Sequence, residues 1–438
     1  MFIDIVILML SFVNRELEIQ ELETLSKKFG LLVVWGRRRI GKTHLLSHWI
    51  QKNGGLYTQA IEGSTGVQLD QVYQDIKEKL ETTIVPKTWN ELFEVLELQK
   101  KPLIFCIDEF PYLVASNPSL PSIFQKWLDH KKKSNVFLIL SGSSSHMIHD
   151  VFLNPTSALY GRAIKLMKLE PLSYESFCKA CGLKPSSENA FIQFSLMGGI
   201  PKYWEFIEKK QSCISTAEKL YFGFSPYMEN EPRRILNDEK VYGLSPINLL
   251  EVIGRGAEKP SEMAARLQVP QTNLSKTLQQ LLDASVLTRE VPFGFSEKDA
   301  KKTLYKITEP SLRFWYRVYS PHRTLWSSYS AQMKNQLLRQ HASTVFEDYC
   351  RKLYPNSMRY WDKNVEIDLV HVPIKSTIKS AKGHDVLVAE VKFKKLRIKE
   401  TQSILNQLTQ KWSLTPTSKK YSNPLFKILD VTNLKKKY

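Results

Sequence analysis

Short apolar runs alternate with amphipathic stretches over the first third of the chain. Apolar runs occupy residues 31–35, 103–107 and 136–140, each bounded by polar turns, and residues 43–50 have the spacing of a helix. Buried strands that alternate with helices are typical of a parallel α/β sheet. The pattern therefore predicts an α/β core over residues 12–168.

The pattern changes after residue 168. Residues 169–237 have helical spacing, are rich in aromatic side chains and are interrupted by Gly-Gly-Ile-Pro at 198–201, which predicts a helical lid. Residues 238–325 contain three helical stretches followed by strands, the order of a winged helix. Residues 331–438 return to a mixed α/β pattern and predict a further small domain.

The first eleven residues form an apolar extension that contains Asp4. The extension lacks the basic region and the cleavage site of a signal peptide, and it is too short to span a bilayer. A buried strand is expected here, and the alternative is an upstream start that adds little to the fold. Because no other stretch approaches a transmembrane helix, the sequence predicts a cytoplasmic protein without a membrane partner.

Composition narrows the class of protein. Of the 438 residues, 42% are hydrophobic and 24% are charged, the proportions of a globular chain and not of a disordered one. Five cysteines do not make a disulfide framework. The pair Cys178 and Cys181 has no second pair and no histidines at metal-ligand spacing, so we expect reduced thiols.

The net charge of +18 is unevenly distributed. Residues 331–438 contain 21 basic and 9 acidic residues, a net charge of +12. A basic domain favours a polyanionic partner, with nucleic acid first and an anionic membrane surface second. A lysine-rich solvated surface explains the same excess without a partner, and charge alone does not separate these explanations.

A phosphate-binding loop follows the first apolar run. Residues 36–43, Gly-Arg-Arg-Arg-Ile-Gly-Lys-Thr, match G-x-x-x-x-G-K-[ST] between a predicted strand and a predicted helix. Backbone N–H groups and the helix N-terminus favour phosphate there, so we expect ATP, with Lys42 at its β- and γ-phosphates and Thr43 on Mg²⁺. A loop that binds nucleotide without hydrolysing it is the alternative. The expected nucleotide contacts are Gly36, Arg37, Arg38, Arg39, Ile40, Gly41, Lys42, Thr43 and His44.

Two acidic residues end the second apolar run. Asp108 is expected to hold Mg²⁺, and Glu109 to orient and polarise the attacking water. They follow the phosphate loop by about 65 residues, a separation that suits intervening βα units. Two solvent-facing acids at a strand end are the alternative explanation.

Polar groups after the third apolar run are further catalytic candidates. Ser141 or Ser143 could contact the γ-phosphate or the attacking water, and the sequence does not choose between them, while a hydroxyl-capped turn explains both equally well. Arg162 follows in Leu-Tyr-Gly-Arg, where an arginine could neutralise transition-state charge in cis or in trans. A surface ion pair is the alternative for Arg162.

The expected recognition helix of the winged helix covers residues 271–282. Its leucines fall on one face and its polar side chains on the other, an arrangement that suits a DNA major groove. Many winged helices contact only proteins, so both partners stay open. Residues 293–302 are expected to form the wing. The side chains expected to face outward are Gln271, Asn273, Lys276 and Gln279.

The tail contains a carboxylate–lysine pattern. Glu347 lies in an amphipathic helix, Asp368 in an expected strand, and Glu390 and Lys392 in a second expected strand, where alternation puts both on one face. Carboxylates that bind Mg²⁺ and a lysine that positions water are the parts of a nuclease site. An acid and a lysine that pair on one strand face explain the pattern without any chemistry.

Taken together, these motifs resemble the archaeal-type P-loop ATPases, AAA-like proteins usually grouped with the STAND NTPases and also present in some bacteria. The resemblance implies that a winged helix and a C-terminal restriction-endonuclease-like domain follow the ATPase core. It also implies that residues 12–17 pack near the adenine and that Pro201 lies in the lid, close to the nucleotide. The motifs are residues 12–17 (FVNREL), 36–43 (GRRRIGKT), 107–110 (IDEF), 141–144 (SGSS), 160–162 (YGR) and 198–203 (GGIPKY).

The leading hypothesis from the sequence is a Mg²⁺-dependent ATPase. It would combine an α/β P-loop NTPase sheet and helical lid with a winged helix and a small, basic, nuclease-like α/β domain. The bound nucleotide would change the arrangement of the winged helix and the nuclease-like domain, which contact nucleic acid or a partner. The alternatives are a DNA-binding protein or nuclease with a regulatory ATPase, and a non-catalytic, ATP-dependent signalling scaffold. Assembly as a homo-oligomer is left open.

Overall fold

The computed structural model describes most of the chain as two compact units. It describes residues 14–99, 102–130, 135–143, 145–208, 210–296, 302–373 and 385–435, so the predicted apolar extension at 1–11 lies outside the described residues. The first unit contains the chain up to 173 with 199–205 and 235–240, and the second contains 174–198, 206–234 and the chain from 241 onward. The predicted lid region is thus divided between the two units.

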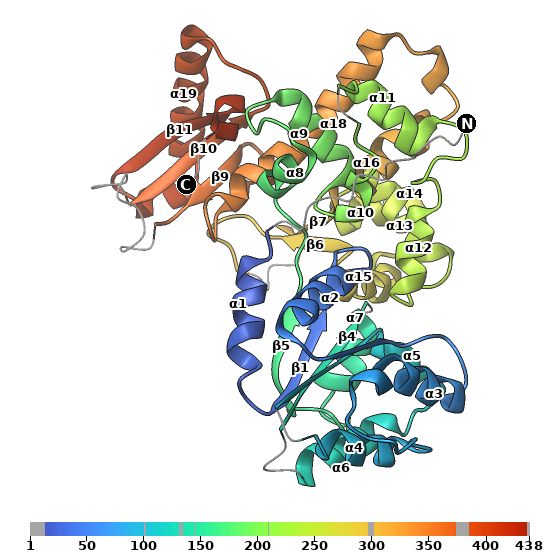
Figure 1. Cartoon of the computed structure of the whole chain (residues 1–438). Helices are drawn as coiled ribbons and strands as arrows, with labels where there is room; N and C mark the ends of the chain where they lie inside the picture. The colour runs from blue at the N-terminus through green and yellow to red at the C-terminus, as the bar shows by residue number, and fades with distance from the viewer. Residues whose placement is uncertain are drawn as a thin grey trace. The chain divides into compact units, whose positions relative to one another are not determined.

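The first unit is built on a parallel five-stranded sheet (Figure 1). Its strands are β1 Gly30–Trp35, β2 Leu56–Gln59, β3 Leu103–Asp108, β4 Val136–Gly142 and β5 Ala163–Lys168. They lie in the order β2-β3-β4-β1-β5, and all neighbouring pairs are parallel. The predicted α/β class and its parallel sheet are therefore confirmed.

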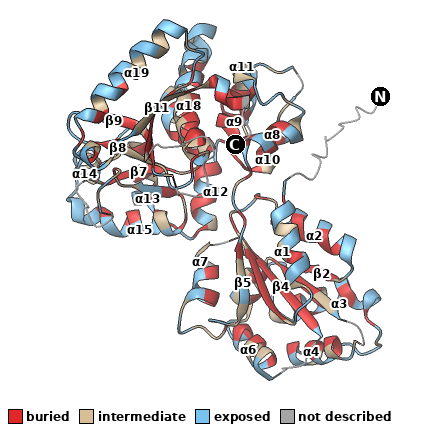
Figure 2. Cartoon of the chain, turned by 90° about the vertical axis from the view of Figure 1, so that its left-hand side faces the viewer, coloured by how far each residue is buried: buried red, intermediate tan, exposed pale blue. Residues whose placement is uncertain are grey.

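Helices cover this sheet and bury its strands. All seven residues of β4 are buried, and the sheet is the main buried part of this unit (Figure 2). The ring of Phe93 stacks on Trp127 at 4.5 Å and meets Phe124 edge-on at 4.8 Å, which fixes helices α4 and α6 to each other. The helices are α1 Glu16–Leu25, α2 Lys42–Asn53, α3 Thr65–Ile76, α4 Trp89–Glu97, α5 Phe110–Ser116, α6 Leu120–His130, α7 Ser145–Ile148 and α10 Pro201–Trp204.

The second unit begins with helices and a two-stranded sheet. After three consecutive helices, the antiparallel strands β6 Leu287–Glu290 and β7 Leu304–Ile307 pair with each other. Leu274, Leu278 and Leu281 are buried. The helix α12, Glu231–Asp238, runs from the second unit into the first. The other helices are α8 Tyr174–Cys181, α9 Glu188–Met197, α11 Cys213–Ala217, α13 Leu244–Gly254, α14 Pro260–Leu267, α15 Ser275–Asp283, α16 Pro310–Phe314, α17 Ser320–His322, α18 Ala331–Lys352 and α19 Ile398–Ser413.

The second unit also contains a mixed four-stranded sheet in the order β11-β10-β9-β8. Its strands are β8 Met358–Trp361, β9 Glu366–His371, β10 Val386–Lys392 and β11 Pro424–Asp430. Strands β10 and β11 are parallel, and the other neighbours are antiparallel. Helix α18 packs on α9, where the ring of Phe346 meets Phe191 edge-on at 5.4 Å. An aromatic residue of the predicted lid thus packs against a helix of the predicted tail domain.

The described part of the expected wing packs on this sheet. The backbone N–H of Phe293 donates to the carbonyl oxygen of Arg359 at 2.7 Å. The rings of Phe293 and Phe295 pack against the core formed by Tyr360 and its neighbours. Both rings are therefore held by the tail sheet, which leaves the polar face of α15 as the more accessible part of this region.

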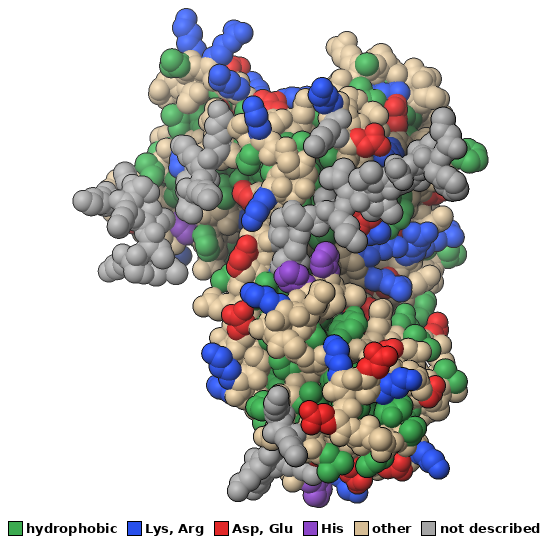
Figure 3. Space-filling model, viewed as in Figure 1, with side chains coloured by type: hydrophobic (Ala, Val, Ile, Leu, Met, Phe, Trp, Pro, Cys, Tyr) green, Lys and Arg blue, Asp and Glu red, His purple; other side chains and the backbone are tan. Residues whose placement is uncertain are grey.

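Three further sequence predictions concern membrane-spanning helices, the cysteines and the basic residues of the tail. None of the helices that the structure describes is long and apolar enough to cross a membrane. The five cysteines are free thiols, and Cys181 is the one that is half-buried while the others are buried. Lys and Arg side chains project into solvent in the region of α19 (Figure 3), where Lys394, Lys395, Arg397 and Lys399 are exposed.

Candidate functional site

The phosphate loop joins the end of β1 to the start of α2. Gly36 has a φ of 151°, and a Cβ on it would lie 2.7 Å from the carbonyl oxygen of Leu169. Gly41 caps α2 with a φ of 97°. Both positions need glycine, because a side chain would be strained at each and would also clash at the first. The two glycines of the motif are thus explained by the backbone path.

The N-cap residue of α1 supports the loop from outside. The Arg15 side chain is 5% exposed, and its Nη2 donates to the carbonyl oxygen of Ile40 at 3.0 Å. Its Nη1 also pairs with Glu18 at 2.7 Å. The described part of residues 12–17 thus contacts the phosphate loop directly. Packing of this segment near the adenine, which the resemblance implied, stays a prediction.

The Lys42 ammonium lies inside the loop. It donates to the carbonyl oxygens of Gly36 at 3.0 Å and Arg37 at 3.2 Å, and to Ser143 Oγ at 2.8 Å. Burial lowers the pKa of Lys42, and the negative charge of Glu109 opposes this shift. Its three acceptors are oxygen atoms, so phosphate oxygens could replace them with the same chemistry.

Asp108 is the most buried acid of this site and accepts three hydrogen bonds. Its Oδ2 accepts from Thr43 Oγ1 at 2.5 Å and from the Tyr57 hydroxyl at 3.0 Å, and its Oδ1 accepts from the Glu109 N–H at 3.0 Å. Burial raises the pKa of the Tyr57 hydroxyl, so it stays a donor. Thr43 and Asp108 present adjacent oxygen atoms, the donor type that Mg²⁺ prefers, and the residues therefore fit the ion.

Ser143 connects the lysine to the second acid. Its Oγ accepts from Lys42 and donates to Glu109 Oε1 at 2.6 Å. Glu109 has a φ of 53° at the start of α5, which turns its side chain back toward the loop. Ser141, the other candidate, is fully buried, and its Oγ has no hydrogen-bond partner among the described residues. The geometry favours Ser143 over Ser141 for a role at the phosphates.

Arg162 lies at the amino ends of the strands, opposite to the ends at which the phosphate loop lies. Its neighbour Ala163 pairs with Leu31, the second residue of β1, whereas the phosphate loop follows the last residue of that strand. The guanidinium forms two hydrogen bonds with the Asp129 carboxylate, each of 2.9 Å. The expectation that Arg162 acts on the nucleotide of its own chain is therefore not supported, and a role in trans stays a prediction.

Two acids of the segment 235–240 approach the phosphate loop. Arg38 Nη1 pairs with Asp238 Oδ1 at 2.8 Å, and the Ser145 N–H donates to Glu239 Oε2 at 3.0 Å. Glu239 is 4% exposed, and burial raises its pKa to about 6. Nothing in the sequence indicated these contacts, because adjacent acids near the end of a polar helix are typical of solvent-facing residues.

Two other predicted contacts are positioned by the same unit. His44 is exposed on the first turn of α2, and Pro201 begins α10. A Cβ on Gly199 would lie 2.3 Å from the carbonyl oxygen of Leu172, so the Gly-Gly-Ile-Pro turn is held closely against the segment after β5. Contacts of His44 and Pro201 with a nucleotide stay predictions.

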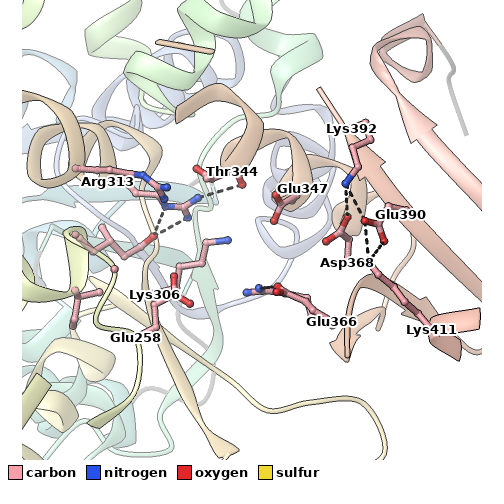
Figure 4. Close-up of a pocket in the computed structure, with 16 residues that line it drawn as sticks. Glu258, Lys306, Arg313, Thr344, Glu347, Glu366, Asp368, Glu390, Lys392 and Lys411 are labelled. Carbon is pink, nitrogen blue, oxygen red and sulfur yellow. Dashed lines mark hydrogen bonds and ion pairs between the residues drawn. The ribbon is translucent and has the colours of Figure 1, made fainter. Parts of the chain in front are cut away.

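A second candidate site lies within the second unit. Glu347 from α18, Asp368 from β9, and Glu390 and Lys392 from β10 line one pocket of about 410 Å³ (Figure 4). Lys392 Nζ donates to Glu390 Oε1 at 2.9 Å and lies 4.0 Å from Asp368 Oδ2. Asp368 Oδ2 also accepts from the Val391 N–H at 2.8 Å. The four residues predicted from the tail sequence are therefore neighbours.

Burial and mutual repulsion perturb these carboxyl groups. Burial and the charge of Asp368 raise the pKa of Glu347 to about 7, and burial and the charge of Glu390 raise the pKa of Asp368. Lys411 of α19, which the sequence did not suggest, lies 3.3 Å from both carboxylate oxygens of Glu390. Within the described ranges, no three Asp, Glu, His or Cys side chains are gathered closely enough to hold a metal ion. The present arrangement therefore does not fit the Mg²⁺ expected here.

Comparisons with known proteins agree with the first site. Residues 12–206 match a family described as an ATPase domain predominantly from Archaea. An uncharacterized protein of Methanocaldococcus jannaschii is 28% identical over 432 residues, which cover 92% of each chain. A Walker-type ATPase of Pyrococcus abyssi has a similar structure, with a TM-score of 0.52 and 18% identity over 70% of this chain and 96% of that one. At this identity the structural likeness shows the fold alone.

Proposed function

We propose, starting from the ATPase domain family that residues 12–206 match, that this chain hydrolyses ATP at its phosphate loop and that the bound nucleotide controls the segment 235–240. The observation that carries the proposal is the hydrogen-bonded chain Lys42–Ser143–Glu109. It joins a phosphate-binding cation to a carboxylate that can orient water, the two elements that phosphoryl transfer to water requires.

Each group of this chain has a distinct role in the proposal. Lys42 exchanges its loop carbonyls for phosphate oxygens, where its charge offsets the charge that develops in the transition state. Glu109 orients a water molecule for attack on the γ-phosphorus. Ser143, which contacts both, holds the carboxylate at a fixed distance from the ammonium. Thr43 and Asp108 would hold Mg²⁺, which when bound neutralises negative charge on the phosphates.

The same proposal explains the acids of the segment 235–240. Asp238 pairs with Arg38 of the loop, and Glu239 is close enough to Lys42 to influence its pKa. A triphosphate adds several negative charges at this place, and like charges repel each other strongly where water is largely excluded. We therefore expect ATP to displace these acids. Because the chain enters the second unit at Val241, displacement would pass the nucleotide state to that unit.

Two substitutions test the ATPase proposal. Lys42→Ala should abolish nucleotide binding, because it removes the buried cation, whereas Glu109→Gln should bind ATP and lose turnover. Glu78→Gln, at an exposed residue outside the site, is the matched control and should keep the rate of wild type. Phosphate release and the affinity for a fluorescent ATP analogue measure the two effects. Unchanged hydrolysis in both Lys42→Ala and Glu109→Gln would overturn the proposal.

Contact with nucleic acid belongs to the same proposal at the winged-helix candidate, α13–α15 with β6 and β7. Gln271, Asn273, Lys276 and Gln279 are all exposed, and side chains of this kind suit the edges of bases in a major groove. Because residues 293–295 pack on the tail sheet, we assign the contact to the helix and not to the wing. A loss of duplex affinity in Lys276→Ala would support this assignment.

Phosphodiester cleavage is a second candidate function, favoured by the pocket around Asp368. Glu347, Asp368 and Glu390 lie together with Lys392 and Lys411 there, and the domain is basic, as a polyanionic substrate requires. Incubating plasmid or single-stranded DNA with Mg²⁺ or Mn²⁺ tests it. Cleavage by wild type that is lost in Asp368→Ala supports a nuclease, and intact DNA under all these conditions excludes one. A signalling scaffold predicts no salt-sensitive affinity for DNA at all.

A further inference from the structure

The pocket around Asp368 has a second wall that the tail sequence does not suggest. Besides the carboxylates, it is lined by Gly254 at the end of α13, by Gly256 in the following loop and by Arg317 after α16. A Cβ on Gly254 would lie 2.4 Å from Tyr316 Cβ, so this wall is closely packed. The carboxylates therefore face a chamber of about 410 Å³ and not an open surface.

The acids are recessed in this chamber. The side chains of Asp368 and Glu390 are 15% and 10% exposed, and Figure 4 shows them pointing toward Glu347. A volume of about 410 Å³ lies at the lower end of the range for sites that hold a small ligand. The major groove of a DNA duplex is by itself about 12 Å wide. A duplex phosphate would therefore be stopped at the rim, whereas an unpaired nucleotide can enter.

The lining is charged and offers no surface for stacking. Of its sixteen residues, eleven are charged and none is aromatic. Such a lining excludes an apolar ligand and gives no platform for base recognition, which in single-strand binding depends on aromatic side chains. The ligand should thus be recognised by phosphate and size, independently of base. The cationic residues of the lining are Lys306, Arg313, Arg317, Arg359, Lys392 and Lys411.

Three of these cations are available to a ligand. Lys306 and Arg313 are committed to the Asp348 carboxylate, at 2.8 and 2.7 Å. Arg359 is paired with two acids, Glu290 and Glu366. Arg317 is exposed, and its guanidinium makes no hydrogen bond to the part of the chain that the structure describes. Lys392 and Lys411 pair with Glu390 but are 36% and 38% exposed.

We infer that this chamber binds the phosphate of one unpaired nucleotide unit, taken from a single strand or from a free mononucleotide, and excludes duplex DNA. Arg317 on one wall and Lys392 and Lys411 on the other contact the phosphate. The inference deepens the second candidate function and rests on it for the chemistry, but the binding preference itself does not require cleavage.

Binding of labelled DNA to the full chain tests the inference, with Ca²⁺ in place of Mg²⁺ to keep the strand intact. The probes are a 12-nucleotide thymidine strand and a blunt hairpin duplex of equal length, with thymidine monophosphate as competitor. Wild type should bind the strand about tenfold more tightly than the duplex. Displacement by the monophosphate would identify a free mononucleotide as a source, and no displacement would leave the strand as the source.

Two variants distinguish binding of DNA in the chamber from binding of DNA to the basic surface outside it. Thr344→Phe fills the chamber and should weaken strand binding about tenfold. Arg317→Ala removes the exposed cation and should weaken strand binding about three- to tenfold. Both variants should leave duplex binding within about twofold of wild type. Lys363→Ala removes an exposed charge outside the chamber and is the matched control.

Three results would overturn the inference: equal affinity of wild type for strand and duplex, no binding of either probe, or unchanged strand binding in both variants. If wild type prefers the strand but does not cleave it in Mg²⁺, the nuclease function is excluded and the inferred binding in the chamber still stands. ATP hydrolysis, measured on the same samples, reports independently on the first proposed function.

Discussion

At the scale of single residues, the nucleotide site depends on side chains that each form hydrogen bonds with two other side chains. Ser143 accepts from Lys42 and donates to Glu109, and Asp108 accepts from both Thr43 and Tyr57. Such bridging groups hold charged side chains in place before a ligand arrives, a condition for electrostatic catalysis.

Removing the bridging hydroxyl should slow the reaction. We expect Ser143→Ala to lower kcat by about tenfold, because Glu109 loses its link to Lys42, while ATP affinity changes less. Ser141→Ala is the matched comparison. It removes a buried hydroxyl that has no partner among the described residues, so it should leave kcat near wild type and not lower stability. Equal losses of kcat in the two variants would contradict the assignment to Ser143.

The buried carboxyl of Glu347 should make stability depend on pH. Its pKa is raised to about 7 by burial and by Asp368, so between about pH 4.5 and 7 the folded state holds a proton that the unfolded chain releases. The free energy of unfolding should therefore fall by about 1–3 kcal/mol as the pH rises through this window. Glu347→Gln should flatten the dependence, and denaturant unfolding at pH 5 and pH 8 measures it. An equally steep slope in the variant would refute the effect.

At the scale of secondary-structure elements, the end of α12 is the feature with the clearest consequence. Asp238 and Glu239 lie against Arg38 and Ser145, next to the place where the phosphates of ATP are expected. Negative charge in this position competes with a nucleotide for the same cations.

Neutralising these acids should tighten nucleotide binding. We expect Asp238→Asn and Glu239→Gln each to lower the Kd for ATP by about three- to tenfold, because each removes one like charge. Lowering the pH from 8 to 6 protonates part of Glu239, whose pKa is about 6, and should tighten binding in wild type more than in Glu239→Gln. Titration with a fluorescent ATP analogue measures both. Weaker binding in these variants would mean that the acids support the site and do not oppose ATP.

The elements that the sequence predicted are those with a strong local pattern. The strands β1, β3 and β4 are apolar and almost fully buried, and they lie within one or two residues of the expected runs. Strands β2 and β5 were not predicted, because β2 has only four residues, β5 buries only Met167, and both are edge strands of the sheet. Their pairing is decided by neighbouring strands and not by their own residues.

The residues of the candidate site likewise fall into those that the sequence predicted and those that it did not. The phosphate loop and the two acids at the end of β3 were predicted because their spacing is local. The choice of Ser143 over Ser141, the approach of Glu239 and the position of Lys411 were not, because each depends on contacts between residues 21 to 101 positions apart. For Arg162 the sequence left a nucleotide contact and a surface ion pair open, and its pairing with Asp129 matches the second, because Arg162 directly precedes β5 at the amino ends of the strands.

At the scale of the whole molecule, the proposals assign the excess of positive charge to two phosphate sites. Arg37, Arg38 and Arg39 belong to the phosphate loop of the first unit, and Lys392 and Lys411 of the basic tail line the carboxylate chamber of the second. We propose that one step connects them: ATP at the loop displaces the segment 235–240, from which the chain continues into the second unit.

Backbone hydrogen exchange tests this claim most directly, in the Glu109→Gln variant so that ATP stays bound. Peptides that contain Ser145 and residues 235–240 would be compared without nucleotide, with Mg²⁺ and ATP, and with Mg²⁺ and ADP. We predict that ATP slows exchange in the phosphate loop and at the same time speeds it in 235–240 and at the Ser145 amide, which loses its bond to Glu239. Slower or unchanged exchange in 235–240, with the loop protected by bound ATP, would contradict it.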